Sequence, residues 1–365
     1  MKSDARVAGA APRLTWKARL LLLGFGVLLM TAALEAGLRL SAVLEARRAR
    51  PDLNAGANAG FWAIYDPDLG YRQNPNYGDM NSDGLRDHPI PPKSDRFRVL
   101  LLGDSVAVYG DSVDDTFVGH MRAELARDGS APPAEVIDAG IKGYTNYQEL
   151  VYLKKFGLKF QPDLVGVEFC LNDLHKFLHS FQVENGKLVP GTYQFSTDAL
   201  AEARDWPRRL ASKSFLLVWA RSKFRVAQDF LRWQASRGFS FDYNATIRTA
   251  WLDEPWTDIE RQMAEMVALG RQHGFRVFLT VVPIQVQYDA SYLARDRAHV
   301  LKPQRKLKEI CERLQIPFLD LFPDLQASMF IDDGIHLTQA GRVQVGQRLG
   351  QWLRKSGYLP VEASK

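Results

Sequence analysis

The chain has 365 residues, of which 46% are hydrophobic and 24% are charged, as in a globular protein with a substantial core. The net charge of +5 is uneven, because residues 1–50 carry nine basic and three acidic side chains while residues 51–365 carry a net −1. Without a basic surplus in its globular part, the chain is not expected to bind nucleic acid. The two cysteines, Cys170 and Cys311, are too few for a disulfide framework and lack metal-site spacing, which indicates free thiols or one bridge.

A basic tail, residues 1–19, precedes the uncharged run LLLLGFGVLLMTAAL at 20–34. Continued to Leu44, this segment is long enough to cross a bilayer. A signal-anchor helix, a cleaved signal peptide and a buried core helix all have such a pattern. No clean A-x-A cleavage site follows, and a core helix behind a basic tail is unusual, so we predict a signal anchor over 20–44. We expect the N-terminus inside and the main domain on the periplasmic side of the inner membrane, although arginines beyond the helix blur the charge asymmetry.

Residues 45–97 are rich in Pro, Gly, Asn and Asp, which predicts a linker and an extended segment that wraps the main domain. In residues 98–355, near-continuous apolar strands alternate with amphipathic helices. The expected strands are 98–105, 134–140, 163–170, 276–283 and 316–322, and the expected helices are 116–127, 146–157, 256–273, 300–314 and 338–355. This pattern predicts a three-layer α/β domain with a mostly parallel, roughly five-stranded sheet. Residues 356–365 remain as a tail.

An insertion at residues 174–250 interrupts the alternation and carries twelve Lys/Arg, six Asp/Glu and many aromatic residues. Because it leaves the C-terminal end of a strand, where open α/β sheets bind ligands, we predict that it caps the site and selects the substrate. Its stretch 214–233 mixes an apolar face with arginine and lysine. That composition suits a lid helix packed on the sheet, and also a helix that lies on an anionic membrane.

The first strand of the alternation ends on Gly103-Asp104-Ser105, an arrangement that can hold a reactive hydroxyl at the rim of a sheet. A serine nucleophile needs a base within hydrogen-bond reach, and the base needs an orienting acceptor. Near the C-terminus, FIDDGIH (330–336) offers Asp333 and His336 three residues apart. Asp332, four residues from the histidine, is the rival acceptor.

Acyl transfer also needs donors for the developing oxyanion. Gly140 in DAGIKGY (138–144) offers its N–H, and Asn172 in CLND (170–173) offers a side-chain amide. With the N–H of Ser105 they make three donors, each at the C-terminal end of a strand. Two acids have supporting roles in this scheme: Asp104 braces the serine turn, and Asp173 binds an arginine or a backbone amide.

The four segments resemble, in order, the motif blocks of the SGNH (GDSL-type) hydrolase superfamily, in its membrane-anchored bacterial type, over roughly residues 98–355. The resemblance implies a flavodoxin-like sandwich in which Ser105 is the nucleophile, His336 the base and Asp333 its orienting acid. It places Gly140 and Asn172 with Ser105 in the oxyanion hole. Two positions depart from the usual blocks, because Cys170 replaces a glycine and Asp138 stands where Asn is frequent. Neither departure removes a catalytic atom.

The sequence therefore predicts a membrane-anchored serine esterase or acyltransferase that forms an acyl-Ser105 intermediate and needs no cofactor or metal. The expected substrate is an O-acylated carbohydrate or a lipid ester. An anchor and an extracytoplasmic domain favour O-acetyl groups on cell-envelope or exported polysaccharide. The alternatives are a lipase- or phospholipase-like esterase at the membrane surface and a non-catalytic envelope scaffold with the same fold.

Overall fold

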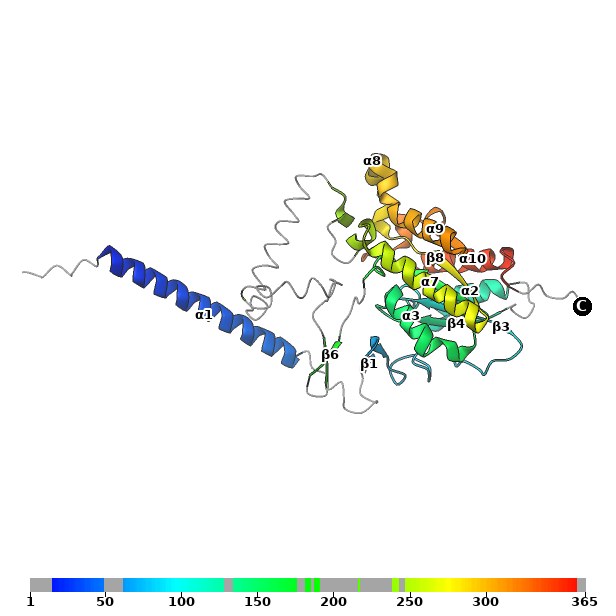
Figure 1. Cartoon of the computed structure of the whole chain (residues 1–365), viewed down its shortest axis with the longest axis horizontal. Coiled ribbons are helices and arrows are strands. Elements are labelled where there is room, and N and C mark those ends of the chain that lie inside the picture. The colour runs from blue at the N-terminus through cyan, green and yellow to red at the C-terminus, as the bar shows by residue number, and fades with distance from the viewer. Residues whose placement is uncertain are drawn as a thin grey trace, which may run out of the picture. The chain divides into compact units, whose positions relative to one another are not determined.

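The computed structural model describes residues 15–48, 62–127, 134–175, 181–184, 187–190, 216, 238–242 and 247–359. The chain forms two compact units, one made of residues 1–50 and 199–232 and the other of residues 51–198 and 233–365. The first unit contains the long helix α1 (Trp16–Arg48), and the second contains the alternating strands and helices (Figure 1).

Helix α1 is long and apolar enough to cross a membrane. Its stretch Trp16–Leu40 has 25 residues, a mean hydropathy of 2.0 and no buried side chains. At 1.5 Å per residue this stretch extends for about 38 Å, more than the ~30 Å of a bilayer's hydrocarbon core. Its one acid, Glu35, pairs with Arg39 one turn later (2.7 Å), which lowers the cost of burying either charge. A membrane anchor and a signal sequence both have this length and composition.

The five-stranded parallel sheet confirms the predicted fold class. Its strand order is β4-β3-β5-β8-β9, the flavodoxin-like order. The strands are β3 (Phe97–Gly103), β4 (Ala134–Gly140), β5 (Leu164–Phe169), β8 (Arg276–Val281) and β9 (Phe318–Asp320). The three central strands are almost wholly buried, because helices cover both faces of the sheet, and this burial explains their continuous apolar sequences.

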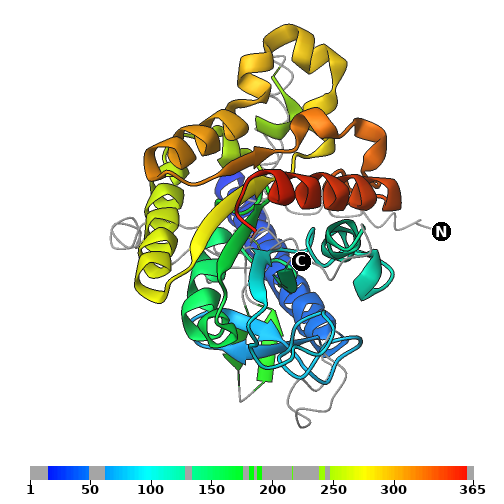
Figure 2. The same ribbon diagram turned by 90° about the vertical axis from the view of Figure 1, so that its right-hand side faces the viewer.

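The helices form two layers around the sheet (Figure 2). One layer holds α2 (Phe117–Leu125) and α10 (Gln339–Lys355), and the other holds α3 (Asn146–Lys155), α7 (Pro255–His273) and α9 (Lys302–Leu314). Connections between parallel strands are right-handed. The chain moves from β3 to β4 in one direction and then back past β3 to β5, so these two connections must cross opposite faces of the sheet. The reversal lies at the carboxyl ends of β3 and β5, the position at which ligands bind in such sheets.

Helix α8 (Ala290–Val300) was not predicted from the sequence. Most of its residues are exposed or half-buried, so it lacks the apolar periodicity that identifies a helix packed on a core. Its local signal is Asp289, whose side chain accepts hydrogen bonds from the N–H groups of Ser291 and Tyr292 and caps the helix.

The segment that precedes the sheet packs against the domain. It begins with an antiparallel hairpin of β1 (Ala63–Asp66) and β2 (Gly70–Gln73). Farther along, the buried carboxylate of Asp87 accepts hydrogen bonds from Arg122 (2.6 Å) and from the N–H of Asp138 (2.8 Å). These contacts tie the segment to α2 and to β4.

Most of the predicted insertion lies outside the described residues, including nearly all of the stretch 214–233, so the cap and both interpretations of that stretch stay predictions. The described parts include an antiparallel hairpin of β6 (Phe181–Glu184) and β7 (Lys187–Pro190). Where the insertion returns to the sheet, Phe241 stacks on Trp251 with ring centroids 4.0 Å apart. The Trp251 indole donates to the carbonyl of His299 in α8 (3.0 Å).

Candidate active site

The structure joins Ser105, His336 and Asp333 in one hydrogen-bonded chain at the carboxyl edge of the sheet. The distance from His336 Nε2 to Ser105 Oγ is 2.8 Å, and from His336 Nδ1 to Asp333 Oδ2 it is 2.5 Å. This is the geometry in which a histidine removes the proton of a serine while a carboxylate fixes its tautomer. The predicted contact between Asp333 and His336 is present, and Asp332 is not the partner.

A tight turn over residues 330–337 holds the Asp333 carboxylate in place. Its Oδ1 accepts hydrogen bonds from the N–H groups of Ile335 and His336, both at 2.9 Å. Between Asp333 and Ile335, Gly334 adopts φ +73°, a conformation that glycine takes without strain. Partial burial acts to raise the pKa of Asp333, but the hydrogen bonds from the His336 ring and the two N–H groups outweigh it and lower the pKa below its usual value. The group is therefore a carboxylate at neutral pH.

The serine turn rests on the buried carboxylate of Asp104. Its Oδ1 accepts from the N–H of Val106 (2.7 Å) and its Oδ2 accepts from Asn172 Nδ2 (3.3 Å), so Asp104 braces the turn as predicted. A side chain at Gly103 would approach Glu168 Oε2 to 2.8 Å. Glycine thus lets the turn cross the end of β3 closely without displacing the Glu168 side chain.

Of the predicted oxyanion donors, Gly140 has its N–H already engaged, because it donates to Asp138 Oδ1 (2.9 Å). Asn172 is buried, gives one amide hydrogen to Asp104 and retains a second one. In the loop after β4, Gly143 adopts φ +75° and its N–H has no hydrogen-bond partner among the described residues. This loop therefore offers Gly143 rather than Gly140 as a free donor. The sequence signal was the second glycine of DAGIKGY.

Asp173 binds a backbone amide, one of the two partners predicted for it. Its Oδ2 accepts from the N–H of Cys170 (2.7 Å), at the end of β5. Cys170 itself is a buried free thiol, as is Cys311.

Four buried carboxyl groups lie together beneath the serine turn, and the sequence analysis missed two of them. They are Asp104, Glu149 of α3, Glu168 of β5 and Asp173, all at most 1% exposed. Burial raises the pKa of each, and their mutual repulsion raises it further in the last three. The described ranges contain no group of three or more His, Cys, Asp or Glu arranged to hold a metal ion. The sequence signal for Glu168 was an acid inside the apolar strand LVGVEF.

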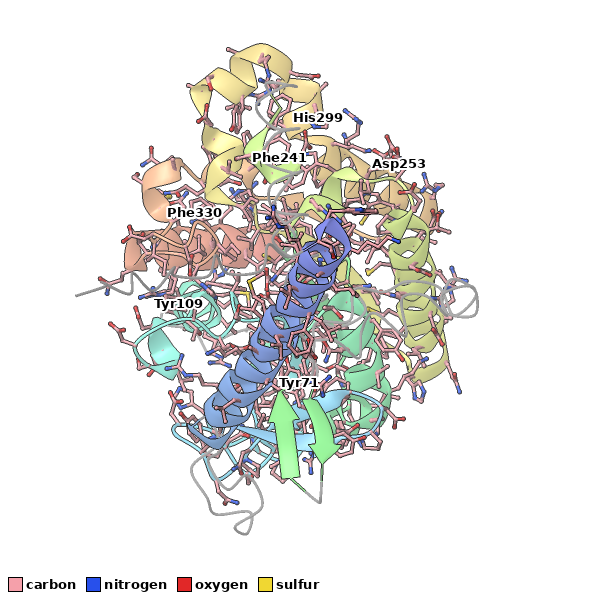
Figure 3. The ribbon with its side chains drawn as sticks, turned by 90° about the vertical axis from the view of Figure 1, so that its left-hand side faces the viewer. Tyr71, Tyr109, Phe241, Asp253, His299 and Phe330 are labelled. Atoms are coloured by element: carbon pink, nitrogen blue, oxygen red, sulfur yellow. The ribbon has the colours of Figure 1, made fainter. Side chains whose placement is uncertain are left out.

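An aromatic ring covers one face of the His336 imidazole. The Tyr109 and His336 rings are stacked with centroids 4.6 Å apart and planes 28° apart. Tyr109, which is labelled in Figure 3, is 36% exposed. The Arg342 guanidinium lies 5.7 Å from the Tyr109 ring and is itself fixed by the carbonyl groups of Asp115 and Leu337. The stack restrains the plane of the base that faces Ser105.

We expect Tyr109→Ala to lower kcat about 5-fold, because losing a ring stack of roughly 1 kcal/mol frees the imidazole to leave its productive orientation. Tyr109→Phe retains the stack and should remain within about twofold of wild type. Steady-state hydrolysis of p-nitrophenyl acetate measures both. An equal loss in the two variants would assign the effect to the phenol oxygen instead of the ring.

The family model for GDSL-like lipases and acylhydrolases matches residues 101–342. Similar solved structures include a lipase/acylhydrolase from Enterococcus faecalis, with 16% identity, a TM-score of 0.43 and coverage of 73% of this chain and 100% of that one. A GDSL-like lipase from Bacteroides thetaiotaomicron has 15% identity, a TM-score of 0.38 and coverage of 73% and 91%. A variant of an acetyl xylan esterase from Geobacillus stearothermophilus has 13% identity, a TM-score of 0.40 and coverage of 74% and 99%. No curated protein sequence matches.

Proposed function

The chain belongs to the GDSL-like lipase/acylhydrolase family and is an SGNH-type hydrolase, and from this premise we propose that it cleaves esters through an acyl-Ser105 intermediate. The observation that carries the proposal is the unbroken chain from Asp333 through His336 to Ser105. These contacts favour a catalytic function over the alternative of a scaffold without activity.

In the proposed first step, His336 Nε2 takes the Ser105 proton while Oγ attacks the ester carbonyl carbon. The N–H groups of Ser105 and Gly143 and the side-chain amide of Asn172 receive the oxyanion. When the tetrahedral intermediate collapses, His336 returns the proton to the departing alcohol and the acyl group stays on Ser105. Water, or the hydroxyl of an acceptor, then attacks the acyl-serine with the same histidine as base.

We propose that the substrate is an O-acetylated carbohydrate of the cell envelope or an exported polysaccharide. Among the described residues, the hydrogen-bonded chain from Asp333 to Ser105 is open on one side, since the Asp333 side chain is 43% exposed and Tyr109 stands at the rim. An open rim with an aromatic ring suits a small acyl group on a large sugar chain, whereas a long acyl chain needs an enclosed apolar channel.

Helix α1 would hold the enzyme at the membrane with its catalytic domain on the periplasmic side. Protease added to spheroplasts should then remove the domain, and protection of the domain would reverse the orientation.

The full chain in detergent, mixed with p-nitrophenyl acetate and quenched in acid, should carry one acetyl group on the peptide that contains Ser105. Ser105→Ala should carry none, and acetyl transfer to another residue of that variant would contradict the assignment. Two further substrates then decide the class of the natural substrate. Release of acetate from an O-acetylated polysaccharide supports the carbohydrate proposal. Faster release of fatty acid from phosphatidylcholine vesicles would show that the substrate is a lipid ester instead.

A further inference from the structure

Two tyrosines join the β1–β2 hairpin to the loop that follows β4. The hydroxyl of Tyr71, on β2, donates to the carbonyl of Lys142 (2.7 Å), and the hydroxyl of Tyr144 donates back to the carbonyl of Tyr71 (2.7 Å). Both residues are at most 1% exposed, and their rings meet edge to face with centroids 5.4 Å apart. Burial holds the pKa of both phenols above the usual value, so both remain donors.

The hairpin forms hydrogen bonds with both backbone polar groups of Lys142. The Gln73 side-chain amide, oriented with its oxygen toward the loop, accepts from the N–H of Lys142 (3.2 Å) and donates to the carbonyl of Gly84 (3.2 Å). The hairpin is in turn fixed to α3, because Gln148 Nε2 donates to the carbonyl of Leu69 (2.7 Å). Because the hairpin binds both the N–H and the carbonyl of Lys142, the loop has little freedom to rotate at this residue.

These hydrogen bonds to Lys142 determine the direction of the N–H of the next residue, Gly143. The carbonyl of Lys142 and the N–H of Gly143 belong to one planar trans peptide and point in opposite directions. Since Tyr71 holds that carbonyl toward the hairpin, it turns the Gly143 N–H away from the hairpin. We propose that Tyr71 is a positioning residue that aims the Gly143 N–H at the oxyanion, an inference that rests on the function proposed above.

We call the contacts of Tyr71 and Gln73 with Lys142 the clamp. Its two hairpin residues lie outside the part of the chain that the family model matches, which begins at residue 101. Tyr71 and Gln73 belong to the segment between α1 and the first strand of the sheet. The segment that contains the β1–β2 hairpin therefore completes the active site of this enzyme. It acts through the clamp on the loop that follows β4 and contains Gly143.

The test compares Tyr71→Phe with Tyr152→Phe in the full chain. Tyr71→Phe keeps the buried ring but deletes the donor to Lys142, so the Gly143 N–H is no longer fixed. Loss of an oxyanion donor costs about 10²–10³ in kcat, and misdirecting one should cost roughly 10-fold, with KM within about twofold. Tyr152 is the matched control, since it is 4% exposed and its ring lies 6.4 Å from that of Tyr144, but its hydroxyl makes no bond to the loop among the described residues. Tyr152→Phe should keep the wild-type kcat.

A Tyr71→Phe enzyme with kcat within twofold of wild type would overturn the proposal, as would an equal loss in Tyr152→Phe. Circular dichroism and the melting temperature separate a loss of kcat from a loss of fold. If Tyr71→Phe does not fold, Tyr144→Phe, which breaks the reciprocal bond, takes its place: the same selective loss of kcat supports the proposal, and an unchanged kcat or an unfolded chain overturns it. Ser105→Ala accompanies every assay, because activity that survives in that variant refutes the proposed function and not the clamp.

Discussion

Ser105→Ala is expected to lower kcat by roughly four to six orders of magnitude, because no other atom in the site can form the acyl intermediate. His336→Ala should cost about as much, since an unactivated hydroxyl is a weak nucleophile at neutral pH. Combining the two substitutions should cost no more than either alone, because the 2.8 Å contact between Ser105 Oγ and His336 Nε2 makes them one functional unit. Progress curves with p-nitrophenyl acetate at high enzyme concentration measure the residual rates. Losses that multiply in the double variant would show that the two residues act separately.

The acid of the catalytic chain can be tested with its neighbour as a control. Asp333→Asn preserves an oxygen for the N–H groups of Ile335 and His336 but presents an amide to His336 Nδ1, which favours the wrong tautomer. A loss of roughly 10²–10⁴ in kcat is expected. Asp332→Asn removes an equivalent charge from an exposed side chain one residue earlier and should leave kcat unchanged. Equal losses in the two variants would point to the charge of the turn rather than to the bond with His336.

The sheet could be predicted from the sequence because its central strands are buried on both faces, which leaves a continuous apolar run in the chain. The same runs placed Ser105 and Asn172 at one edge, since parallel strands end together. The catalytic partners were predictable because Asp333 and His336 are close in the sequence and belong to a turn that fixes both.

The details that the sequence analysis missed depend on contacts between distant segments. Residue type alone does not show that the Gly140 N–H is taken by Asp138, because the choice between Gly140 and Gly143 depends on how the loop folds. The bond between Tyr71 and Lys142 joins residues 71 positions apart, and no local pattern encodes it. An extended wrapping segment was predicted, but its contact with the site was not.

Ionisation of Asp138 should lower the free energy of unfolding as the pH rises, and Asp138→Asn should remove this decrease. The carboxyl is fully buried and its Oδ2 has no hydrogen-bond partner among the described residues. Burial, and then repulsion by Asp87, raise the pKa of Asp138 to about 7, whereas in the unfolded chain it is about 3.9. Between these values the folded state binds more protons than the unfolded state, so the free energy of unfolding falls as the pH rises from about 4 to about 7 and is constant above.

The loss is on the order of 4 kcal/mol, which is the difference of about three pKa units at 1.36 kcal/mol each. Asp138→Asn keeps an oxygen for the Gly140 N–H and introduces the residue that is frequent at this position in the motif block, but it cannot ionise. The melting temperatures of the variant and the wild type should therefore agree near pH 4 and diverge toward pH 8, where the variant should be the more stable. Buried acids that do not interact with Asp138 titrate equally in both proteins. The difference between the two curves therefore reports Asp138 together with its repulsion of Asp87 and Glu168. Parallel curves from pH 4 to pH 8 would mean that Asp138 is ionised at no cost in the folded protein.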